Sequence, residues 1–356
     1  MQHYRAALCG LGNIAWRFDH GSTGPVRLSH AGAFLAHTRV RLVSGFDPEI
    51  RERKAFTKAL KLPAFDSLEA LLAEKPDLVS ICSPAPWHFE QAMACMEKAV
   101  PMIWLEKPPA LTLGEMDALI QTSEQRGSTL LVNYQRRYLP SYQELKKALT
   151  EESLGPCRHI RAVYSRGLEA NGSHMLDMIF FLTEDRMKAE LLWVSGKGES
   201  PSFGFRLKTQ SEIESTPNGM PHPAPLPEGD KGPCGFRKLP EDVEVSVTGM
   251  DLSYHNIDME LTCEQGRLSV LHGGMTALVE KKEEHEHFQG FFRLKTDPDA
   301  PLTRLSGIAG AMENALSDLM ESHEKQRPPL STLRSSRNTM ALMERVRNFQ
   351  KTGRAL

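Results

Sequence analysis

At 356 residues the chain is too long for one ordinary domain, and division by about 150 residues per domain predicts about two. The 43 Lys and Arg residues against 45 Asp and Glu residues give a formal net charge of −2. This balance excludes the broad basic surface that sequence-independent nucleic-acid binding needs. A hydrophobic content of 40% is enough for folded cores and excludes wholesale disorder.

The cysteines and the apolar segments indicate the compartment. The opening MQHYRAALCG does not have the basic and apolar regions of a secretory signal, and no run of about 18 apolar residues would span a membrane. The six cysteines are Cys9, Cys82, Cys95, Cys157, Cys234 and Cys263. The closest two are 13 positions apart, so no pair has the spacing of a metal site or a redox motif. We therefore expect a reduced, cytoplasmic protein without a metal site.

The first 135 residues alternate predicted strands with predicted helices. Continuous apolar strands are expected at Tyr4–Cys9, Arg39–Phe46, Asp77–Cys82, Met102–Leu105 and Ser128–Asn133. Helices are expected at Leu68–Glu74, at Pro86–Lys98, and between a T-x-x-E capping box at Thr112 and a terminating Gly127. This alternation predicts right-handed βαβ units, and so an α/β domain with a doubly wound parallel sheet covered on both faces.

The pattern changes after Tyr138, where most of the predicted strands, from residue 190 to residue 294, follow one another without helices between them. Strands are expected at 158–164, 190–194, 202–207, 243–250, 259–262, 267–270 and 291–294, and helices at 140–149, 171–182, 307–324 and 331–350. Strands in succession predict an α+β domain with an open, mostly antiparallel sheet. Residues 196–240 are rich in glycine and proline, which predicts a long loop that is either functional or disordered.

A dinucleotide-binding fingerprint follows the first predicted strand. Residues 10–15 read GLGNIA, which is G-x-G-x-x-A, and a helical stretch is expected after them. The first glycine permits a tight turn, the second lets the backbone approach a pyrophosphate, and the helix N-terminus supplies N–H groups.

The acidic residue that this fingerprint requires is Asp47, at the end of the second predicted strand. Its separation from Gly12 is 35 positions, longer than the usual ~20, and the excess suggests an insertion at Phe18–Ser29, within or after the first helix. A carboxylate favours NAD because it repels a 2′-phosphate. The nearby Arg51 and Arg53 leave NADP open as an alternative.

Two further segments carry groups suited to acid–base chemistry. Glu106-Lys107-Pro108 follows a predicted strand, and open α/β sheets bind ligands at the carboxyl ends of their strands. His174 and Asp177 are three positions apart and share one face of a predicted helix. A histidine can accept the proton of an alcohol near neutral pH, and a carboxylate can orient it.

Taken in order, these residues resemble the Gfo/Idh/MocA family of nicotinamide-dependent oxidoreductases over almost the whole chain. GLGNIA is similar to its dinucleotide turn, and VSICSPAPWHFEQAMACMEKAVPMIWLEKPPALT is similar to its block from a Pro-x-x-His helix to Glu-Lys-Pro. VNYQRRYLP resembles its domain-junction segment, NGSHMLDMIFFL its G-x-H-x-x-D helix, and LSTLRSSRNTMALMERVRNFQKTG its closing helix. Several motifs in one order are far more specific than any one of them.

The resemblance implies a role for each matching residue. Gly10, Gly12, Asn13 and Ile14 would line the pyrophosphate, Asp47 would bind the adenosine ribose, and Ser83, Pro84, Trp87 and His88 would pass near the nicotinamide half. Glu106 would lie at the nicotinamide, Lys107 would contact the reacting hydroxyl, His174 would accept its proton, and Asn133 and Arg137 would hold cofactor or substrate. Ala170 departs from the pattern, because many members carry an aspartate four residues before the histidine; Asp177 would partly replace it.

The resemblance also implies three parts of the chain. Residues 1–136 would form a dinucleotide-binding Rossmann domain, and residues 137–330 a substrate domain whose sheet serves assembly into a homodimer or homotetramer. Residues 331–356 would form a helix that packs near the domain junction.

The resulting hypothesis is an NAD(P)-dependent oxidoreductase that acts on a CH–OH group of a sugar, polyol or sugar derivative. A related alternative is an NADPH-dependent reductase of a C=O or C=N bond. Two other classes stay open. One is a dinucleotide-binding sensor that has lost catalysis, and the other is a glycosidase that retains NAD and oxidises its sugar only transiently.

Overall fold

The computed structural model describes residues 3–22, 24–150, 154–183, 188–208, 242–274, 276–296 and 308–354. Of the predicted loop at 196–240, the part from residue 209 onwards lies outside the described residues, as does Cys234. The chain divides into two compact units. The first comprises residues 1–140 and 308–341, and the second comprises residues 141–307 and 342–356.

The first unit contains a six-stranded sheet in the order β3-β2-β1-β4-β5-β6. Its strands are β1 (Tyr4–Cys9), β2 (Val40–Phe46), β3 (Ala64–Phe65), β4 (Leu78–Ile81), β5 (Met102–Leu105) and β6 (Thr129–Val132). Each neighbouring pair is parallel. This order is that of a doubly wound Rossmann sheet, which confirms the predicted fold class.

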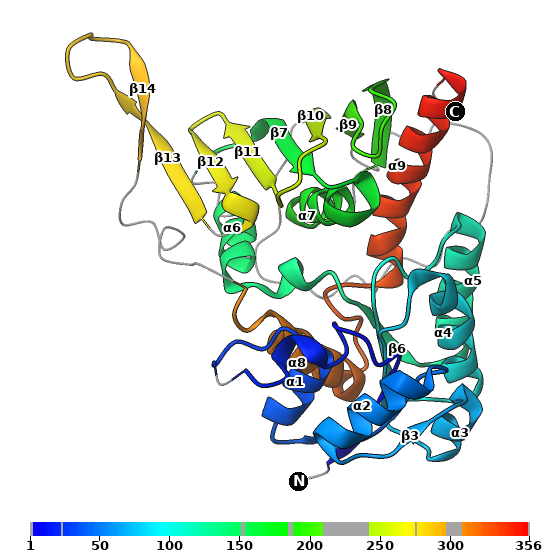
Figure 1. The fold of residues 1–356 in the computed structure, drawn as a ribbon. Helices are drawn as coiled ribbons and strands as arrows, with labels where there is room; N and C mark the ends of the chain where they lie inside the picture. Colours follow the sequence, from blue (N-terminus) through cyan, green and yellow to red (C-terminus); the bar gives the residue numbers. More distant parts are fainter. Residues whose placement is uncertain are drawn as a thin grey trace. The chain divides into compact units, whose positions relative to one another are not determined.

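Helices bury both faces of this sheet (Figure 1). On one face lie α1 (His30–Ala36), α2 (Ile50–Leu60) and α8 (Ala311–Lys325). On the other lie α3 (Leu68–Ala73), α4 (His88–Glu97), α5 (Leu113–Arg126) and the start of α9 (Leu333–Thr352). As predicted, α5 begins at the capping box of Thr112 and ends at Gly127, which has a left-handed conformation.

Helix α8 corrects the predicted domain division. Residues 308–330 were expected in the second domain, but they group with the first unit. Leu316 and Leu319 of α8 are fully buried in the same cluster as Phe34 and Trp104. The reason is the apolar face of α8, which completes one covering layer of the parallel sheet.

The second unit contains an eight-stranded sheet in the order β14-β13-β12-β11-β7-β10-β9-β8. Its strands are β7 (Cys157–Ser165), β8 (Lys188–Ser195), β9 (Ser202–Lys208), β10 (Asp242–Met250), β11 (Ile257–Cys263), β12 (Gly266–Leu271), β13 (Thr276–Glu284) and β14 (Phe292–Thr296). Strands β7 and β10 are parallel, and the other pairs are antiparallel. The prediction of a mostly antiparallel sheet is therefore confirmed. The unit also contains α6 (Pro140–Thr150) from Ser141 onwards and α7 (Ser173–Leu182).

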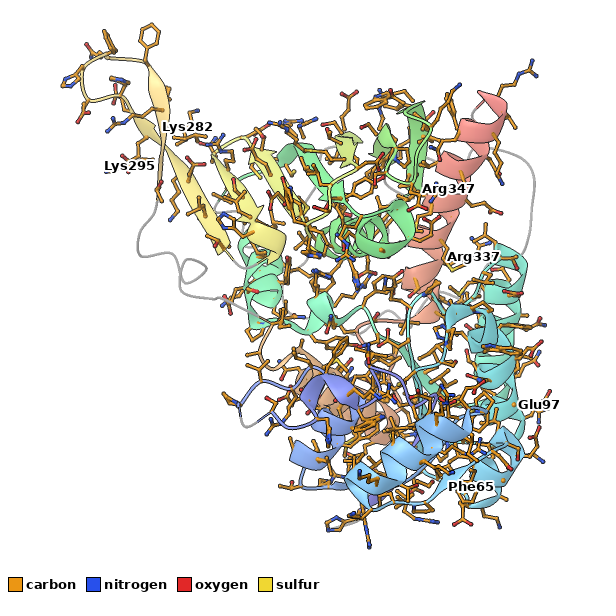
Figure 2. The ribbon with its side chains drawn as sticks, viewed as in Figure 1. Phe65, Glu97, Lys282, Lys295, Arg337 and Arg347 are labelled. Carbon is orange, nitrogen blue, oxygen red and sulfur yellow. The ribbon has the colours of Figure 1, made fainter. Side chains whose placement is uncertain are left out.

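Strand β13 was not predicted, because its second half is charged. It pairs with β14 to form a hairpin arm that extends from the sheet (Figure 1). Lys282 and Lys295 lie on the two strands of this arm (Figure 2). Lys282 stacks over the ring of Phe292 at 4.4 Å, and Lys295 pairs with Glu283 at 3.1 Å. Cross-strand contacts of this kind compensate for the missing apolar alternation.

The register of the second sheet also places Cys157 opposite Cys263, which sequence spacing did not indicate. The five cysteines in the described part of the chain are buried and free. None of the described helices is long and apolar enough to cross a membrane. Within the described ranges, no cluster of three or more His, Cys, Asp or Glu side chains could hold a metal ion.

Candidate functional site

A pocket of about 730 Å³ lies in the first unit, at the carboxyl ends of β1, β2 and β4. This is the edge where open α/β sheets bind ligands, and the volume is that of a small-molecule or cofactor site. Its lining includes eight of the predicted cofactor residues, which are Gly10, Gly12, Asn13, Ile14, Asp47, Ser83, Pro84 and Trp87. The pocket therefore gathers the fingerprint loop and the ends of two other strands at one place.

The two glycines of the fingerprint have different structural requirements. Gly10 has a φ of +87°, and a Cβ atom there would lie 2.5 Å from the backbone nitrogen of Ser83. Gly12 has no atom within 4 Å of where its Cβ would be, and it lines the pocket. Gly10 is thus required by the fold, whereas Gly12 leaves open space beside the backbone where a cofactor can approach.

The expected helix after the fingerprint is interrupted, so of the two predicted places for the insertion, within or after the first helix, the structure shows the first. Residues 13–16 form a turn, and α1 begins only at His30. The N–H groups of His30 and Ala31 donate to the carbonyls of Ile14 and Ala15. In an α-helix, each carbonyl accepts from the N–H group 4 positions later in the chain. Here the N–H group lies 16 positions later, so 12 residues are inserted within the helix. That length matches the predicted Phe18–Ser29 segment.

The inserted segment is folded back by one carboxylate. Asp19 accepts hydrogen bonds from the backbone N–H groups of Leu28 and Ser29, and from the Ser29 hydroxyl at 2.5 Å. Ser29 in turn caps α1 by accepting from the N–H of Gly32 at 3.1 Å. The segment also reaches the pocket, where Phe18 forms part of the lining. The end of the insertion therefore supplies the N-cap of α1.

Asp47 has the placement expected of a ribose-binding carboxylate. It lies directly after β2, lines the pocket, and has 9% of its surface exposed. Its Oδ2 accepts from the N–H of Leu11 at 2.9 Å, and its Oδ1 accepts from the N–H of Glu49 at 2.9 Å. One carboxylate thus joins the glycine loop to the start of α2.

The charges around Asp47 favour NAD over its 2′-phosphate form. Glu49 and Glu52 also line this part of the pocket, and Glu52 forms an ion pair with Arg17. The guanidinium of Arg53 donates to the backbone carbonyls of Asp47 and Pro48 at 2.8 and 2.7 Å. Of the two arginines that leave NADP open as an alternative, Arg53 is thus engaged by the backbone, whereas Arg51 is exposed on α2.

His88 lies outside the pocket lining and has 1% of its surface exposed. Its two ring nitrogens lie 2.7 Å from the carbonyl oxygens of Ser83 and Pro108. It therefore connects the loop after β4 to the loop after β5. A direct contact of His88 with a cofactor stays a prediction.

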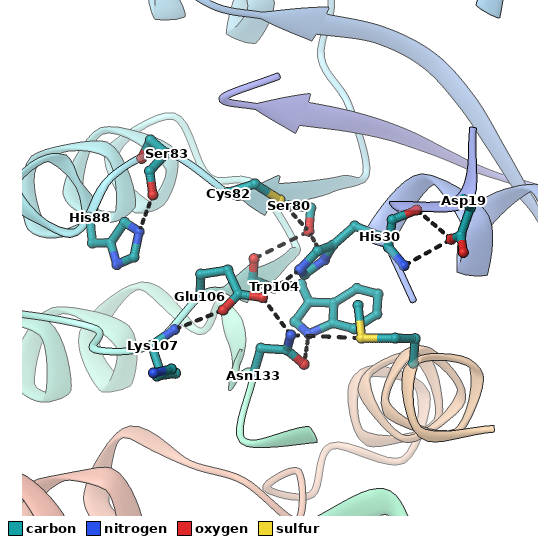
Figure 3. A network of polar contacts seen from close by, with 12 residues as sticks. Asp19, His30, Ser80, Cys82, Ser83, His88, Trp104, Glu106, Lys107 and Asn133 are labelled. Carbon is teal, nitrogen blue, oxygen red and sulfur yellow. Dashed lines mark hydrogen bonds and ion pairs between the residues drawn. The ribbon is translucent and has the colours of Figure 1, made fainter. Parts of the chain in front are cut away.

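Glu106 follows β5 and is held in a buried network of polar side chains (Figure 3). Its Oε1 lies 2.9 Å from Nε2 of His30 and accepts from Nδ2 of Asn133 at 2.5 Å. Burial raises the pKa of Glu106, but the hydrogen bond and charge of His30, the amide of Asn133 and the charge of Lys107 outweigh it. The net pKa lies below the usual value, so the carboxyl is ionised at neutral pH.

Lys107 is the cationic group next to this carboxylate. Burial lowers its pKa, the charge of Glu106 raises it, and the charge of Arg136 lowers it, so the net pKa lies below the ordinary lysine value. The peptide bond between Lys107 and Pro108 is cis. Glu106 and Lys107, an acidic and a basic residue, thus lie at the same edge of the sheet as the pocket.

Asn133 and Arg137 are placed differently from the other predicted cofactor residues. Both are buried, with 3% and 0% of their surfaces exposed, and neither lines the pocket. Nη1 of Arg137 donates to the carbonyl of Leu330 at 3.3 Å. The contacts of Asn133 are with Trp104, Glu106 and Met312. The structure therefore indicates positioning roles, and cofactor contact by these residues stays a prediction.

His174 and Asp177 lie on α7 of the second unit. Every residue of α7 except His174 is buried, and Asp177 has 1% of its surface exposed. A π-helical turn, Leu168–Gly172, precedes α7 and contains Ala170. Such turns are frequent at functional sites. The predicted proton acceptor is thus the accessible residue of its helix, and Asp177 is suited to orienting rather than to contacting substrate.

Sequence reasoning missed His30, which contacts Glu106 from α1. Its local signal was weak, because only Ser29, a good N-cap residue, marks the start of that helix. Its partner Glu106 lies 76 positions away.

Comparison with known proteins agrees with this geometry. The Gfo/Idh/MocA family model, described as an oxidoreductase family with an NAD-binding Rossmann fold, matches residues 4–134. The match to this family therefore covers strands β1 to β6 of the first unit.

Two curated relatives match less than half of the chain. UDP-N-acetylglucosamine 3-dehydrogenase of Acidithiobacillus ferrooxidans is 36% identical over 132 residues, which is 36% of this chain and 42% of that protein. D-glucoside 3-dehydrogenase of Escherichia coli is 28% identical over 153 residues, or 42% and 40% of the two chains. The matched region thus spans about two fifths of the length of these relatives.

Solved Gfo/Idh/MocA structures match over the whole chain. The WlbA dehydrogenase from Chromobacterium violaceum, solved in complex with NADH and UDP-GlcNAcA, superposes with a TM-score of 0.72 at 17% identity. The match covers 99% of this chain and 95% of that one. This likeness shows that the chain shares the fold of that dehydrogenase over both units.

Proposed function

We propose that this protein is an NAD-dependent oxidoreductase that acts on a CH–OH group of a sugar or sugar derivative. The observation that carries the proposal is the arrangement at one sheet edge of the first unit. A pocket with a glycine loop and a ribose-type carboxylate at Asp47 lies at the ends of β1, β2 and β4, and an ionised Glu106 followed by Lys107 lies at the end of β5. The curated relatives act on sugar hydroxyls, as their names state, which supports the substrate class.

The residues present fit NAD. Gly12 leaves room beside the backbone for a pyrophosphate, since a Cβ there would contact nothing. Asp47 offers carboxylate oxygens for the two hydroxyls of an adenosine ribose. Gly10, Gly12, Asn13 and Ile14 would hold the phosphates, and Asp47 the ribose. Bound NAD supplies the hydride acceptor for alcohol oxidation.

The chain's own groups would manage the proton and the developing charge. The ammonium group of Lys107 would stabilise the substrate oxygen as it becomes an alkoxide, because a charge in water-poor surroundings is only weakly screened. His174 would accept the hydroxyl proton, and Asp177 would help to orient its imidazole. Glu106 would hold Lys107 in its charged form.

Binding and turnover assays test the proposal directly. NAD at millimolar concentration is expected to raise the melting temperature, because a ligand that binds only the native state stabilises it. The holoprotein is then expected to produce NADH with at least one member of a panel of sugars and nucleotide sugars. Product formation without net NADH would indicate the transient-oxidation glycosidase, and NAD binding without any turnover would indicate a sensor.

Asp47→Asn is expected to narrow the preference for NAD over NADP by at least ~10-fold. Asparagine keeps one acceptor oxygen for the loop, but it removes the charge that repels a 2′-phosphate. Calorimetric titration with both dinucleotides measures the ratio of dissociation constants. Glu97→Gln is the matched control, because it removes an exposed carboxylate of α4 that does not line the pocket (Figure 2). An unchanged ratio in Asp47→Asn would contradict the assigned role.

A further inference from the structure

The carboxylate of Glu106 is fixed by donors from three segments of the first unit. His30 on α1 lies 2.9 Å from Oε1, Asn133 after β6 donates to the same oxygen at 2.5 Å, and the backbone N–H of Lys107 donates to Oε2 at 3.2 Å. The Glu106 side chain is 13% exposed. A carboxylate held on both oxygens cannot rotate away from Lys107 without breaking these bonds.

His30 can adopt only one orientation in this network. Its side chain has no exposed surface, and its ring lies against the indole of Trp104 with centroids 4.1 Å apart. Nδ1 lies 2.5 Å from the hydroxyl of Ser80, so Nε2 faces Glu106. Because an ionised carboxylate only accepts, Nε2 must carry the proton. The ring is thus a fixed donor to Glu106 (Figure 3).

The amide of Asn133 is oriented by a second aromatic contact. The indole N–H of Trp104 can only donate, and it lies 3.2 Å from Oδ1 of Asn133. The other end of the amide, Nδ2, therefore faces Glu106. Trp104 thus orients both donors, since it packs on His30 and bonds to Asn133.

The network adjoins the candidate cofactor pocket and contains few charges. Cys82 lines that pocket, and its thiol contacts the hydroxyl of Ser80 at 3.8 Å. Among the described residues, the charged groups that act on Lys107 include Glu106, on its own loop, and Arg136, from the segment after β6. Arg136 disfavours the ammonium form, so Glu106 supplies the opposing negative charge.

We propose that His30 is a positioning residue that, together with Asn133, fixes the ionised carboxylate of Glu106 beside Lys107 and so keeps Lys107 cationic. The inference rests on the proposed function for its catalytic meaning, because Lys107 is the group that would stabilise the alkoxide. The inserted Phe18–Ser29 segment then also has a use, since Asp19 holds the start of the helix that carries His30.

Direct titration of Lys107 tests the proposal without substrate. The lysines are labelled by reductive methylation with ¹³C-formaldehyde, and the Lys107 resonance is assigned by its absence in Lys107→Arg. In His30→Leu, which cannot donate to Glu106, Lys107 is expected to lose its proton at a lower pH than in the wild type. His30→Gln keeps a donor near the Nε2 position and is expected to restore much of the wild-type titration.

A matched control and a second variant keep the test decisive. His37→Ala removes a histidine at the end of the same helix that does not contact Glu106, and it should leave the titration unchanged. If His30→Leu does not fold, Asn133→Ala removes the other side-chain donor to Oε1 and should shift the titration in the same direction. Unchanged titration of Lys107 in a folded His30→Leu or Asn133→Ala variant would overturn the proposal.

Kinetics separate this proposal from the proposed function. In His30→Leu, kcat is expected to fall about 10-fold, and the alkaline limb of the pH profile should move to lower pH, because Lys107 deprotonates sooner. A purely structural role would lower kcat at all pH values without moving that limb, and this result would overturn the proposal. If the wild type oxidises no sugar, the proposed function fails, while the titration of Lys107 still decides the role of His30.

Discussion

Lys107→Ala is expected to lower turnover by at least ~10²-fold and to leave the affinity for NAD nearly unchanged. Lys107 directly follows the ionised Glu106 at the carboxyl end of β5 and is not part of the lining of the cofactor pocket. Its contribution would be made to the developing alkoxide rather than to the cofactor. A loss of ~10² corresponds to about 2.7 kcal/mol of transition-state stabilisation. Steady-state kinetics and calorimetric titration with NAD measure the two quantities separately.

Two related variants and one control sharpen this result. His174→Ala is expected to lower turnover by a similar factor, because the hydroxyl proton would lose its acceptor. Lys107→Arg should also lose most activity, since a planar guanidinium does not replace a compact ammonium group. Lys98→Ala removes an exposed lysine at the end of α4 and should behave like the wild type. Near-wild-type turnover in both Lys107→Ala and His174→Ala would show that the catalytic groups lie elsewhere.

Gly12→Ala is expected to weaken NAD binding by at least ~10-fold while leaving the free energy of unfolding within about 1 kcal/mol of the wild type. Its new Cβ would meet no protein atom and would project into the space where the cofactor backbone must approach. Calorimetric titration with NAD measures the first effect, and urea unfolding without NAD measures the second.

Gly10→Ala provides the contrast, because there the added Cβ would lie 2.5 Å from the backbone of Ser83 at a φ of +87°. We expect this variant to lose at least ~2 kcal/mol of stability before any cofactor is added. If Gly12→Ala bound NAD as tightly as the wild type, the pyrophosphate would not pass over this loop.

Local signals in the sequence predicted much of the fold. Strands β1 and β5 have the predicted bounds, and α5 begins and ends at its predicted caps, because apolar runs and capping residues act through near neighbours. Strand β13 was missed, because the charged residues of its second half are stabilised by pairing with β14 rather than by a core. Helix α8 was placed in the wrong unit, since an amphipathic pattern shows that a face is buried but not which sheet covers it.

The candidate site also has some features that the sequence predicted and others that only the structure shows. Asp47 and the fingerprint glycines were predicted from their distance to a strand end, and the structure gathers them in one pocket. The insertion was predicted from an excess of spacing, but only the hydrogen bonds of Ile14 and Ala15 show that it interrupts a helix. Without its 12 residues, the separation of Gly12 and Asp47 falls from 35 to 23 positions, close to the usual ~20.

The sequence by itself determined a near-neutral chain of about two domains, a dinucleotide-binding first unit, and the residue types available for alcohol oxidation. These follow from composition, periodicity and short motifs, which depend on residues close together in the chain. Only the tertiary structure decided that His30, Asn133 and Trp104 surround Glu106, and that Cys157 lies opposite Cys263. The physical reason is that the packing of distant segments brings these groups together. The contact between His30 and Glu106 joins residues 76 positions apart, and such a contact produces no periodic pattern in the sequence.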